Sequence, residues 1–372
     1  MKFLRQRHQR QKVLSFTILV FIGFSVSLLL PFQTHKSKDS LYLVLNQRDD
    51  ISARCEDDKF IVSLDRERNN ENKETLNGCE NTDKEFEPSL RKNMQFVSRY
   101  SFNVSKMLME RLQLDKNGIE FLARPNACDV LLPTFVTALS DNHYEEFVSL
   151  HKNITKLRKT KYPRLVLIVY DIGLSVDNAN RVQEICNSSC NFRTFPFKMF
   201  PRHVQNLRGY TWKPIIIQIM LQEFDFVMWI DTSIRLLNTD PYFLRAKCIG
   251  IQMLGGEGSI AVRTQHRLFY HFKEDECMFN YPEIQTGVVI VSRTYFILKY
   301  IMRPWVACAL EYGCMDFPNS KRFLNCSTKW ALSNCHRFEQ STLGIITTRL
   351  FNNRRHQFIL GEDFSRICRH YN

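Results

Sequence analysis

The sequence predicts an α/β protein with a mostly parallel sheet flanked by helices, and three observations lead to this prediction. Short apolar runs that end on polar residues recur after residue 126, as in LIVYD and FVMWID. Segments with the helical spacing of apolar residues separate these runs. Strands buried on both faces are continuous apolar runs, and their alternation with helices is typical of parallel sheets. The 44% hydrophobic content of the 372 residues is enough for a sizeable core.

The N-terminus predicts a membrane anchor. Residues 13–32 form an uncharged apolar stretch long enough to span a bilayer, after a basic tail of residues 1–12. A cleaved signal peptide is the alternative, but its apolar region is usually about 7–15 residues and precedes a small-residue cleavage site, which is not visible here. The basic tail predicts a single-pass type II membrane protein of the Golgi or endoplasmic reticulum, with its domain in the lumen.

The remaining chain divides into two parts. Residues 33–125 are polar and charged over long stretches and are interpreted as a luminal stalk and lead-in. Residues 126–372 form the predicted globular domain. The net charge of +13 suggests nucleotide diphosphates or acidic glycans as partners, or simply a solvated basic surface. A luminal domain does not meet nucleic acid, so none is expected.

Cysteines and glycosylation sequons agree with a luminal location. All twelve cysteines follow the apolar stretch, which suits disulfide formation, although their pairing cannot be read from the sequence. The sequence contains no paired C-x2-C arrangement of the kind that would indicate a zinc site. Four N-x-S/T sequons are candidate glycosylation sites: Asn103, Asn153, Asn187 and Asn325.

The expected elements follow in order along the domain. Strands are expected within 129–139, 164–173, 193–197, 226–231, 248–254 and 284–293. Helices are expected within 144–159, 182–186, 211–224, 266–280 and the second half of 334–351, with a further helix in 295–313 that breaks near Pro304. Thr211 is a possible cap of the third helix, and Pro214 suits its first turn. The segment GGEGS, residues 255–259, is expected to be a loop or turn.

Several motifs carry a family resemblance. YDIGL, then YTWKP, then FVMWIDTSIR, together with IQTGVVIVSR and CHRFEQSTLGII, resemble a largely uncharacterised family of animal, notably nematode, glycosyltransferase-like proteins with an N-terminal anchor. The resemblance covers roughly residues 126–365. Beyond that family, the layout is similar to the Rossmann-like GT-A fold of nucleotide-sugar transferases. It implies a nucleotide-sugar donor, most simply a UDP-sugar, and a glycan or glycoprotein acceptor.

The resemblance implies a donor site at the end of the strand FVMWID. GT-A enzymes hold Mn²⁺ or Mg²⁺ there with a D-x-D motif, whereas this chain has Asp231 and then Ser233 in the place of the second acid. Asp231 and Ser233 could still bind a metal, or Lys213 and Arg235 could replace its charge beside the helix near Pro214. The structural alternative is that Asp231 only caps a turn.

Other residues at strand ends are candidates for the same site. Thr137 and Asp171 end two strands and would face the nucleoside, although Asp171 before Gly173 also suits a turn. Gln285 and Gly287 open a later strand and would line the sugar pocket.

An inverting transfer also needs a base for the acceptor hydroxyl. Glu339, in HRFEQ, is favoured because it resembles an acid–Gln pair found late in GT-A sequences, and Glu283 is the second candidate. Each could instead be an ordinary solvated charge, and His336 could be structural or bind phosphate or metal. The alternative function is a catalytically silent luminal or cell-surface glycan-binding protein with the same fold.

Overall fold

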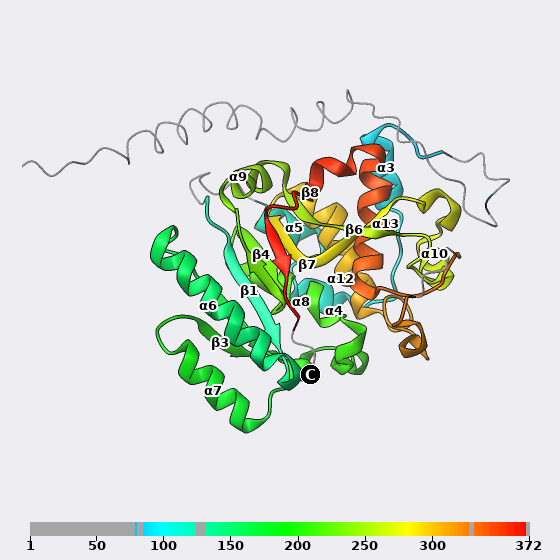
Figure 1. Cartoon of the computed structure of the whole chain (residues 1–372). Helices are drawn as coiled ribbons and strands as arrows, with labels where there is room; N and C mark the ends of the chain where they lie inside the picture. Colours follow the sequence, from blue (N-terminus) through cyan, green and yellow to red (C-terminus); the bar gives the residue numbers. More distant parts are fainter. Residues whose placement is uncertain (1–78, 80–84, 124–130, 327–330, 370–372) are drawn as a thin grey trace, which may run out of the picture. The chain divides into compact units, whose positions relative to one another are not determined.

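The structure is a computed structural model that describes residue 79 and residues 85–123, 131–326 and 331–369 (Figure 1). The predicted tail and anchor, residues 1–32, lie outside these ranges. Within them, no helix is both long and apolar enough to cross a bilayer.

A seven-stranded sheet forms the centre of the described chain, in the order β3-β2-β1-β4-β7-β6-β8. The first four of these strands pair in parallel, β7 runs antiparallel to β4 and β6, and β8 is parallel to β6. The predicted α/β class with a mostly parallel sheet is therefore confirmed. The strands are β1 (Thr134–Leu139), β2 (Leu167–Asp171), β3 (Asn191–Thr194), β4 (Phe226–Ile230), β6 (Ile251–Ser259), β7 (Pro282–Ser292) and β8 (Ile359–Leu360).

A second, two-stranded sheet pairs β5 (Ile234–Leu236) antiparallel with β9 (Ser365–Ile367). β5 begins directly after the turn that follows β4, and β9 lies close to the C-terminus. β9 is thereby held next to the carboxyl end of β4.

Helices cover both faces of the central sheet (Figure 1). One apolar layer includes residues of α6 (Tyr144–Thr160), α7 (Val176–Cys186) and α9 (Asp240–Ile249). The opposite layer includes residues of α8 (Trp212–Glu223), α10 (His266–Phe272), α12 (Arg303–Leu310) and α13 (Phe338–Phe351). α11 (Tyr295–Ile297) leads into α12 through a π-helical turn, Leu298–Met302, just before Pro304, where the sequence predicted a break.

The two-sided burial of β4 explains why its sequence, FVMWI, is apolar at every position. Val227 and Trp229 face the layer that holds α8 and α13, whereas Met228 and Ile230 face the layer that holds α6 and α9. Successive side chains of a strand point to opposite faces, so a strand covered on both sides must be apolar at every position. The first charge, Asp231, therefore comes where the strand leaves the sheet.

The compact unit begins earlier than residue 126, where the sequence predicted the domain start. α3 (Leu90–Val97), α4 (Lys106–Arg111) and α5 (Lys116–Leu122) lie in the predicted lead-in, and their apolar residues pack in the same layer as α8 and α13. A disulfide also joins Cys79 to Cys277. These helices have only 8, 6 and 7 residues, which is too short for a sustained helical period in the sequence.

A further expectation on secondary structure was wrong. The segment 255–259 is not a turn: β6 continues through it, and its pairing with β7 shifts register between Gly255 and Ser259, after an earlier shift between Met253 and Leu254. Glycines are compatible with such bulges, because they tolerate irregular backbone. Thr211 occupies the N-cap position of α8, as predicted, but its side chain makes no capping hydrogen bond.

Disulfides are present, as the cysteine distribution predicted. Besides the Cys79 bridge, the described residues contain the pairs Cys186–Cys190, Cys308–Cys314 and Cys326–Cys335. Cys248 is also disulfide-bonded, and Cys368 has a free thiol.

Candidate functional site

Three charged side chains from separate elements meet at the carboxyl end of β4. Asp231 follows β4, Lys213 lies in the first turn of α8, and Glu339 lies in the first turn of α13. The Nζ atom of Lys213 is 3.1 Å from Oδ1 of Asp231 and 3.0 Å from Oε1 of Glu339. We call these three residues the Lys213 cluster. The sequence predicted a role for each of them, and the structure places all three together.

Hydrogen bonds from the sheet fix the two carboxylates. The indole Nε1 of Trp229 donates to Oδ1 of Asp231 at 2.7 Å, and the hydroxyl of Thr286 donates to Oε1 of Glu339 at 2.8 Å. Lys213 also donates to the carbonyl oxygen of Thr286 at 3.4 Å. Every member of the cluster therefore has at least two partners, which is how buried charges are normally accommodated.

The backbone entering α13 is unusual directly before Glu339. Phe338 has a φ of 46°, in the left-handed region, although it is not glycine and is buried. Such a conformation costs about 1–3 kcal/mol and persists only where the surroundings enforce it. Here, the ring of Phe338 packs 4.7 Å from His336 and 6.0 Å from Tyr210, measured between ring centroids.

Burial and charge act on Lys213 in opposite directions. Burial by itself lowers the pKa of the ammonium, but Asp231 and Glu339 outweigh this effect, so the pKa lies above its ordinary value. Only 3% of the Lys213 side chain is exposed. The ammonium is therefore charged and enclosed, and two carboxylates against one ammonium leave the cluster with one net negative charge.

The cluster opens to solvent at Asp231. The side chain of Asp231 is 35% exposed, whereas that of Glu339 is 7% exposed. Gly287 borders this opening, because a Cβ added there would lie 3.7 Å from Oδ2 of Asp231. Tyr210, which is 37% exposed, lies beside the cluster with its ring centroid 5.7 Å from Nζ of Lys213. A ligand would therefore reach Asp231 first.

The carboxylate of Asp231 does not cap a turn, which was the structural alternative. Its bonds go to the side chains of Trp229 and Lys213, while its backbone carbonyl accepts from Ile234 at 3.0 Å to close the turn. The carbonyl oxygen of Ser233, in the same turn, accepts from the backbone of Cys368 at 2.7 Å.

Arg235 faces away from this opening. Strand alternation turns its side chain away from Ile234, which lies beside Gly287. The guanidinium donates to the carbonyl oxygens of Thr232, Ile234 and Glu146. The predicted phosphate contact of Arg235 therefore conflicts with the structure, because the guanidinium is buried in backbone hydrogen bonds.

The donor groups at Asp231 do not fit a divalent cation. Mn²⁺ and Mg²⁺ require several oxygen ligands. Within the described ranges, no group of three His, Cys, Asp or Glu side chains is arranged to hold a metal. Asp231 offers one carboxylate, and its Oδ1 already contacts an ammonium and an indole N–H. A cation bound there would lie beside the positive charge of Lys213.

Glu283 belongs to a separate group of residues on β7. It pairs with Arg263 and accepts from Nε2 of Gln340 at 2.9 Å, and its side chain is 6% exposed. Gln285, two residues along β7, is half-buried and pairs with Leu254. Glu283 therefore contacts the residue that follows Glu339, but it is not a member of the Lys213 cluster.

Three other predicted residues have clear structural surroundings. Oδ1 of Asp171 accepts from the backbone of Gly173 and Leu174 at 2.8 Å each, which is the turn that the sequence allowed as an alternative. Thr137 was predicted to face the nucleoside, but it is completely buried and its hydroxyl has no partner. It is therefore not accessible to a ligand. Nε2 of His336 donates to the carbonyl oxygen of Met315 at 2.9 Å, which indicates a structural role.

Sequence reasoning missed two residues that shape the site, Trp229 and Thr286. Trp229 precedes Asp231 by two positions, so the strand period places both on one face. That spacing was an available signal for a contact between them. The bond between Thr286 and Glu339 joins distant segments, and no local pattern reveals it.

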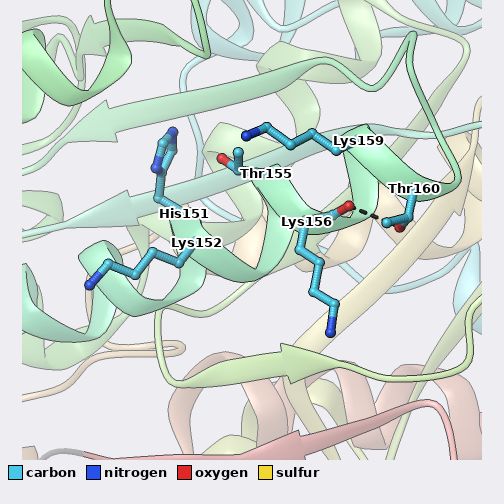
Figure 2. A pocket seen from close by; sticks show the side chains of 6 residues that line it. All are labelled: His151, Lys152, Thr155, Lys156, Lys159 and Thr160. Carbon is cyan, nitrogen blue, oxygen red and sulfur yellow. Dashed lines mark hydrogen bonds between the residues drawn. The ribbon is translucent and has the colours of Figure 1, made fainter.

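A separate hollow of about 460 Å³ lies over α6, lined by His151, Lys152, Thr155, Lys156, Lys159 and Thr160 (Figure 2). The long side chains point in different directions and do not converge on one point. A single helix face with exposed lysines is normally a solvated surface, so this hollow is not a candidate site.

Comparisons with known proteins give one sequence match and several structural similarities. Residues 126–218 match the family model "Protein of unknown function (DUF1647)". Comparison with curated protein sequences gives no match. The chain is similar to the apo structure of the bifunctional glycosyltransferase WbbM, with 11% identity and a TM-score of 0.38, over 62% of this chain and 39% of that one.

Two further solved structures are similar to parts of the chain. The galactosyltransferase LgtC, in complex with donor and acceptor sugar analogues, has 16% identity and a TM-score of 0.30, over 44% of this chain and 59% of that one. The mannosyltransferase Ktr4p from S. cerevisiae has 11% identity and a TM-score of 0.33, over 58% of this chain and 74% of that one. All three structures are glycosyltransferases, the class that the sequence resembles.

Proposed function

We propose that this chain is a glycosyltransferase-like type II membrane protein that transfers a sugar from a nucleotide-sugar donor to a glycan or glycoprotein acceptor in the Golgi or endoplasmic reticulum. A UDP-sugar is the expected donor. One observation carries the proposal: a partly exposed carboxylate, Asp231, lies at the carboxyl end of a central strand, next to the N-terminus of α8. Ligands of open α/β sheets bind at such strand ends.

The reaction needs two charge changes that this site can support. The bond between the anomeric carbon and the diphosphate oxygen breaks, and a bond to the acceptor oxygen forms while the acceptor proton leaves. The positive end of the α8 dipole favours the negative charge that develops on the diphosphate. Asp231 can accept hydrogen bonds from sugar hydroxyls, and Glu339 is the proposed base or holds Lys213 in place.

A specific observation favours a second candidate function. Both carboxylates of the cluster pair with one buried ammonium, and Glu339 and Glu283 are almost fully enclosed. A site without a free base would suit a protein that binds a glycan and does not turn it over.

Donor hydrolysis and thermal melting of the full-length chain separate these functions. We expect one nucleotide sugar from a panel to raise the melting temperature by a few degrees at 100-fold excess over its Kd, about 2.7 kcal/mol of stabilisation. Asp231→Asn should abolish this shift and any donor hydrolysis. The fold should persist, because Lys213 keeps Glu339 as a counter-ion.

Asp177→Asn is the matched control, because Asp177 is an exposed acid on α7. This variant should behave like the original chain. Glycan binding without donor binding would support the second function, and full donor turnover by Asp231→Asn would contradict the proposed role of the cluster.

A further inference from the structure

The C-terminal arm, residues 361–369, is tied to the strand that follows Asp231. β9 pairs with β5 so that Ile367 lies opposite Ile234, and the backbone N–H of Cys368 then donates to the carbonyl oxygen of Ser233 at 2.7 Å. The two segments run antiparallel. The next residue of the arm, Arg369, therefore lies at the level of the turn that carries Asp231.

The Lys213 cluster lacks an accessible positive charge for a diphosphate. Lys213 is enclosed between two carboxylates, and the guanidinium of Arg235 donates to three backbone carbonyls on the other side of β5. The cluster itself has one net negative charge. A diphosphate at the opening would be repelled unless another cation faced it.

Arg369 is exposed and carries such a charge. Its placement rests on the β5–β9 register, and its charge also acts on Tyr210: burial, Glu339 and Asp231 raise the pKa of this tyrosine, whereas Lys213 and Arg369 lower it. Each of these four charged groups therefore acts on Tyr210, whose ring lies 5.7 Å from Nζ of Lys213.

We infer that Arg369, at the end of the C-terminal arm, supplies the positive charge that meets the diphosphate of a bound nucleotide sugar, in place of a metal held by Asp231. This inference rests on the proposed function. It also follows from the donor groups at Asp231, which do not fit a divalent cation.

A guanidinium suits this role chemically. Its planar N–H donors can bind two phosphate oxygens at once and remain charged at every physiological pH. When the bond between the anomeric carbon and the diphosphate breaks, its electron pair stays on the departing oxygen, and Arg369 stabilises that charge without transferring a proton.

The test is the Kd of UDP and of GDP for the full-length chain, measured by calorimetry in EDTA and again with Mn²⁺. We expect binding in EDTA that Mn²⁺ does not strengthen. Arg369→Ala should raise the Kd about 10- to 100-fold, the usual range for the loss of a charged hydrogen bond. Arg369→Lys should retain part of the affinity, because it keeps the charge and loses the fork of donors.

Arg366→Ala is the matched control. Arg366 is an exposed arginine on the same arm, opposite Arg235 in β5, and its removal should leave the Kd unchanged. Binding that requires Mn²⁺, or an unchanged Kd in Arg369→Ala, would overturn this inference and leave the proposed function in place. No binding of either nucleotide, or of any nucleotide sugar, would overturn the proposed function as well.

Discussion

At the scale of single residues, the burial of His336 makes the free energy of unfolding depend on pH. Its imidazole is 1% exposed and lies between the backbone of Gln265 and Met315. Burial lowers its pKa from 6.5 to about 4. The folded protein therefore holds this histidine neutral where the unfolded chain would protonate it.

The free energy of unfolding should fall as the pH drops from 6.5 towards 4. The unfolded chain takes up a proton on this imidazole below pH 6.5, whereas the folded chain does so only near pH 4. Between pH 7 and pH 5 the loss should be about 2 kcal/mol. Urea denaturation of the original chain and of His336→Gln at both pH values measures it.

The variant should lose most of this difference between the two pH values, even if it is less stable at both. His266→Gln is the control, because His266 is exposed and should leave the pH dependence intact. Equal pH dependence in the original chain and His336→Gln would show that another group is responsible.

At the scale of elements, the side chain of Asn153 in α6 makes the two hydrogen bonds to β5 that a neighbouring strand would make. Nδ2 of Asn153 donates to the carbonyl oxygen of Leu236 at 3.2 Å, and its Oδ1 accepts from the backbone N–H of Leu236 at 2.9 Å. This pair of bonds satisfies one edge of β5, whose other edge pairs with β9. Asn153 is therefore a structural residue, although it lies in a sequon.

We expect the native protein to carry no glycan at Asn153. A sugar on Nδ2 would displace this pair of bonds, whereas the other three sequon asparagines, Asn103, Asn187 and Asn325, are exposed. Glycopeptide mass spectrometry of the chain produced in the secretory pathway should find sugar only at those three sites. Replacing each of them with Gln should remove one glycan, and Asn153→Gln should remove none.

A glycan at Asn153 in folded protein would contradict this reading of the α6–β5 contact. A chain without any glycan would instead count against the proposed luminal location, so the two outcomes are separable.

The elements also show what the sequence could predict. Buried strands such as β4 were predictable, because being covered on both faces demands a continuous apolar run. The extension of β6 through GGEGS was not, because glycines usually indicate a turn, and only pairing with β7 holds them extended. The helices of the lead-in were missed because each is short and packs through few apolar residues.

The residues of the Lys213 cluster could be predicted from the sequence, but the contacts between them could not. Asp231 and Lys213 were predicted from strand-end and helix-start positions, which are local features. Their shared bond, and the contact of Lys213 with Glu339, depend on the packing of α8 and α13 on the sheet. Arg235 was assigned to the donor because sequence proximity to Asp231 does not reveal which side of β5 it faces.

At the scale of the whole molecule, the lead-in is part of the core. A buried ion pair joins Glu274 to Arg349 of α13, and the hydroxyl of Tyr100 donates to Glu274 at 2.6 Å. The guanidinium of Arg349 also lies 4.5 Å from the ring centroid of Phe86 and 4.3 Å from that of Phe96. Residues before 126 thus complete the surroundings of a charge buried in the domain.

A chain shortened to begin at residue 126 should therefore fail to fold. It would expose the apolar surfaces of α8 and α13 that the lead-in covers. It would also remove seven buried side chains, each less than 9% exposed: Phe86, Leu90, Val97, Leu112, Leu114, Ile119 and Leu122. Burial of one such side chain contributes about 1.5–3 kcal/mol, so their sum matches or exceeds the usual 5–15 kcal/mol of net stability.

A chain that begins at residue 79 keeps these residues and the Cys79–Cys277 bridge. Circular dichroism during heating should show a cooperative transition for the longer chain and none for the shorter one. A cooperative transition in the shorter chain, at a similar temperature, would show that the domain boundary lies at residue 126 as the sequence predicted.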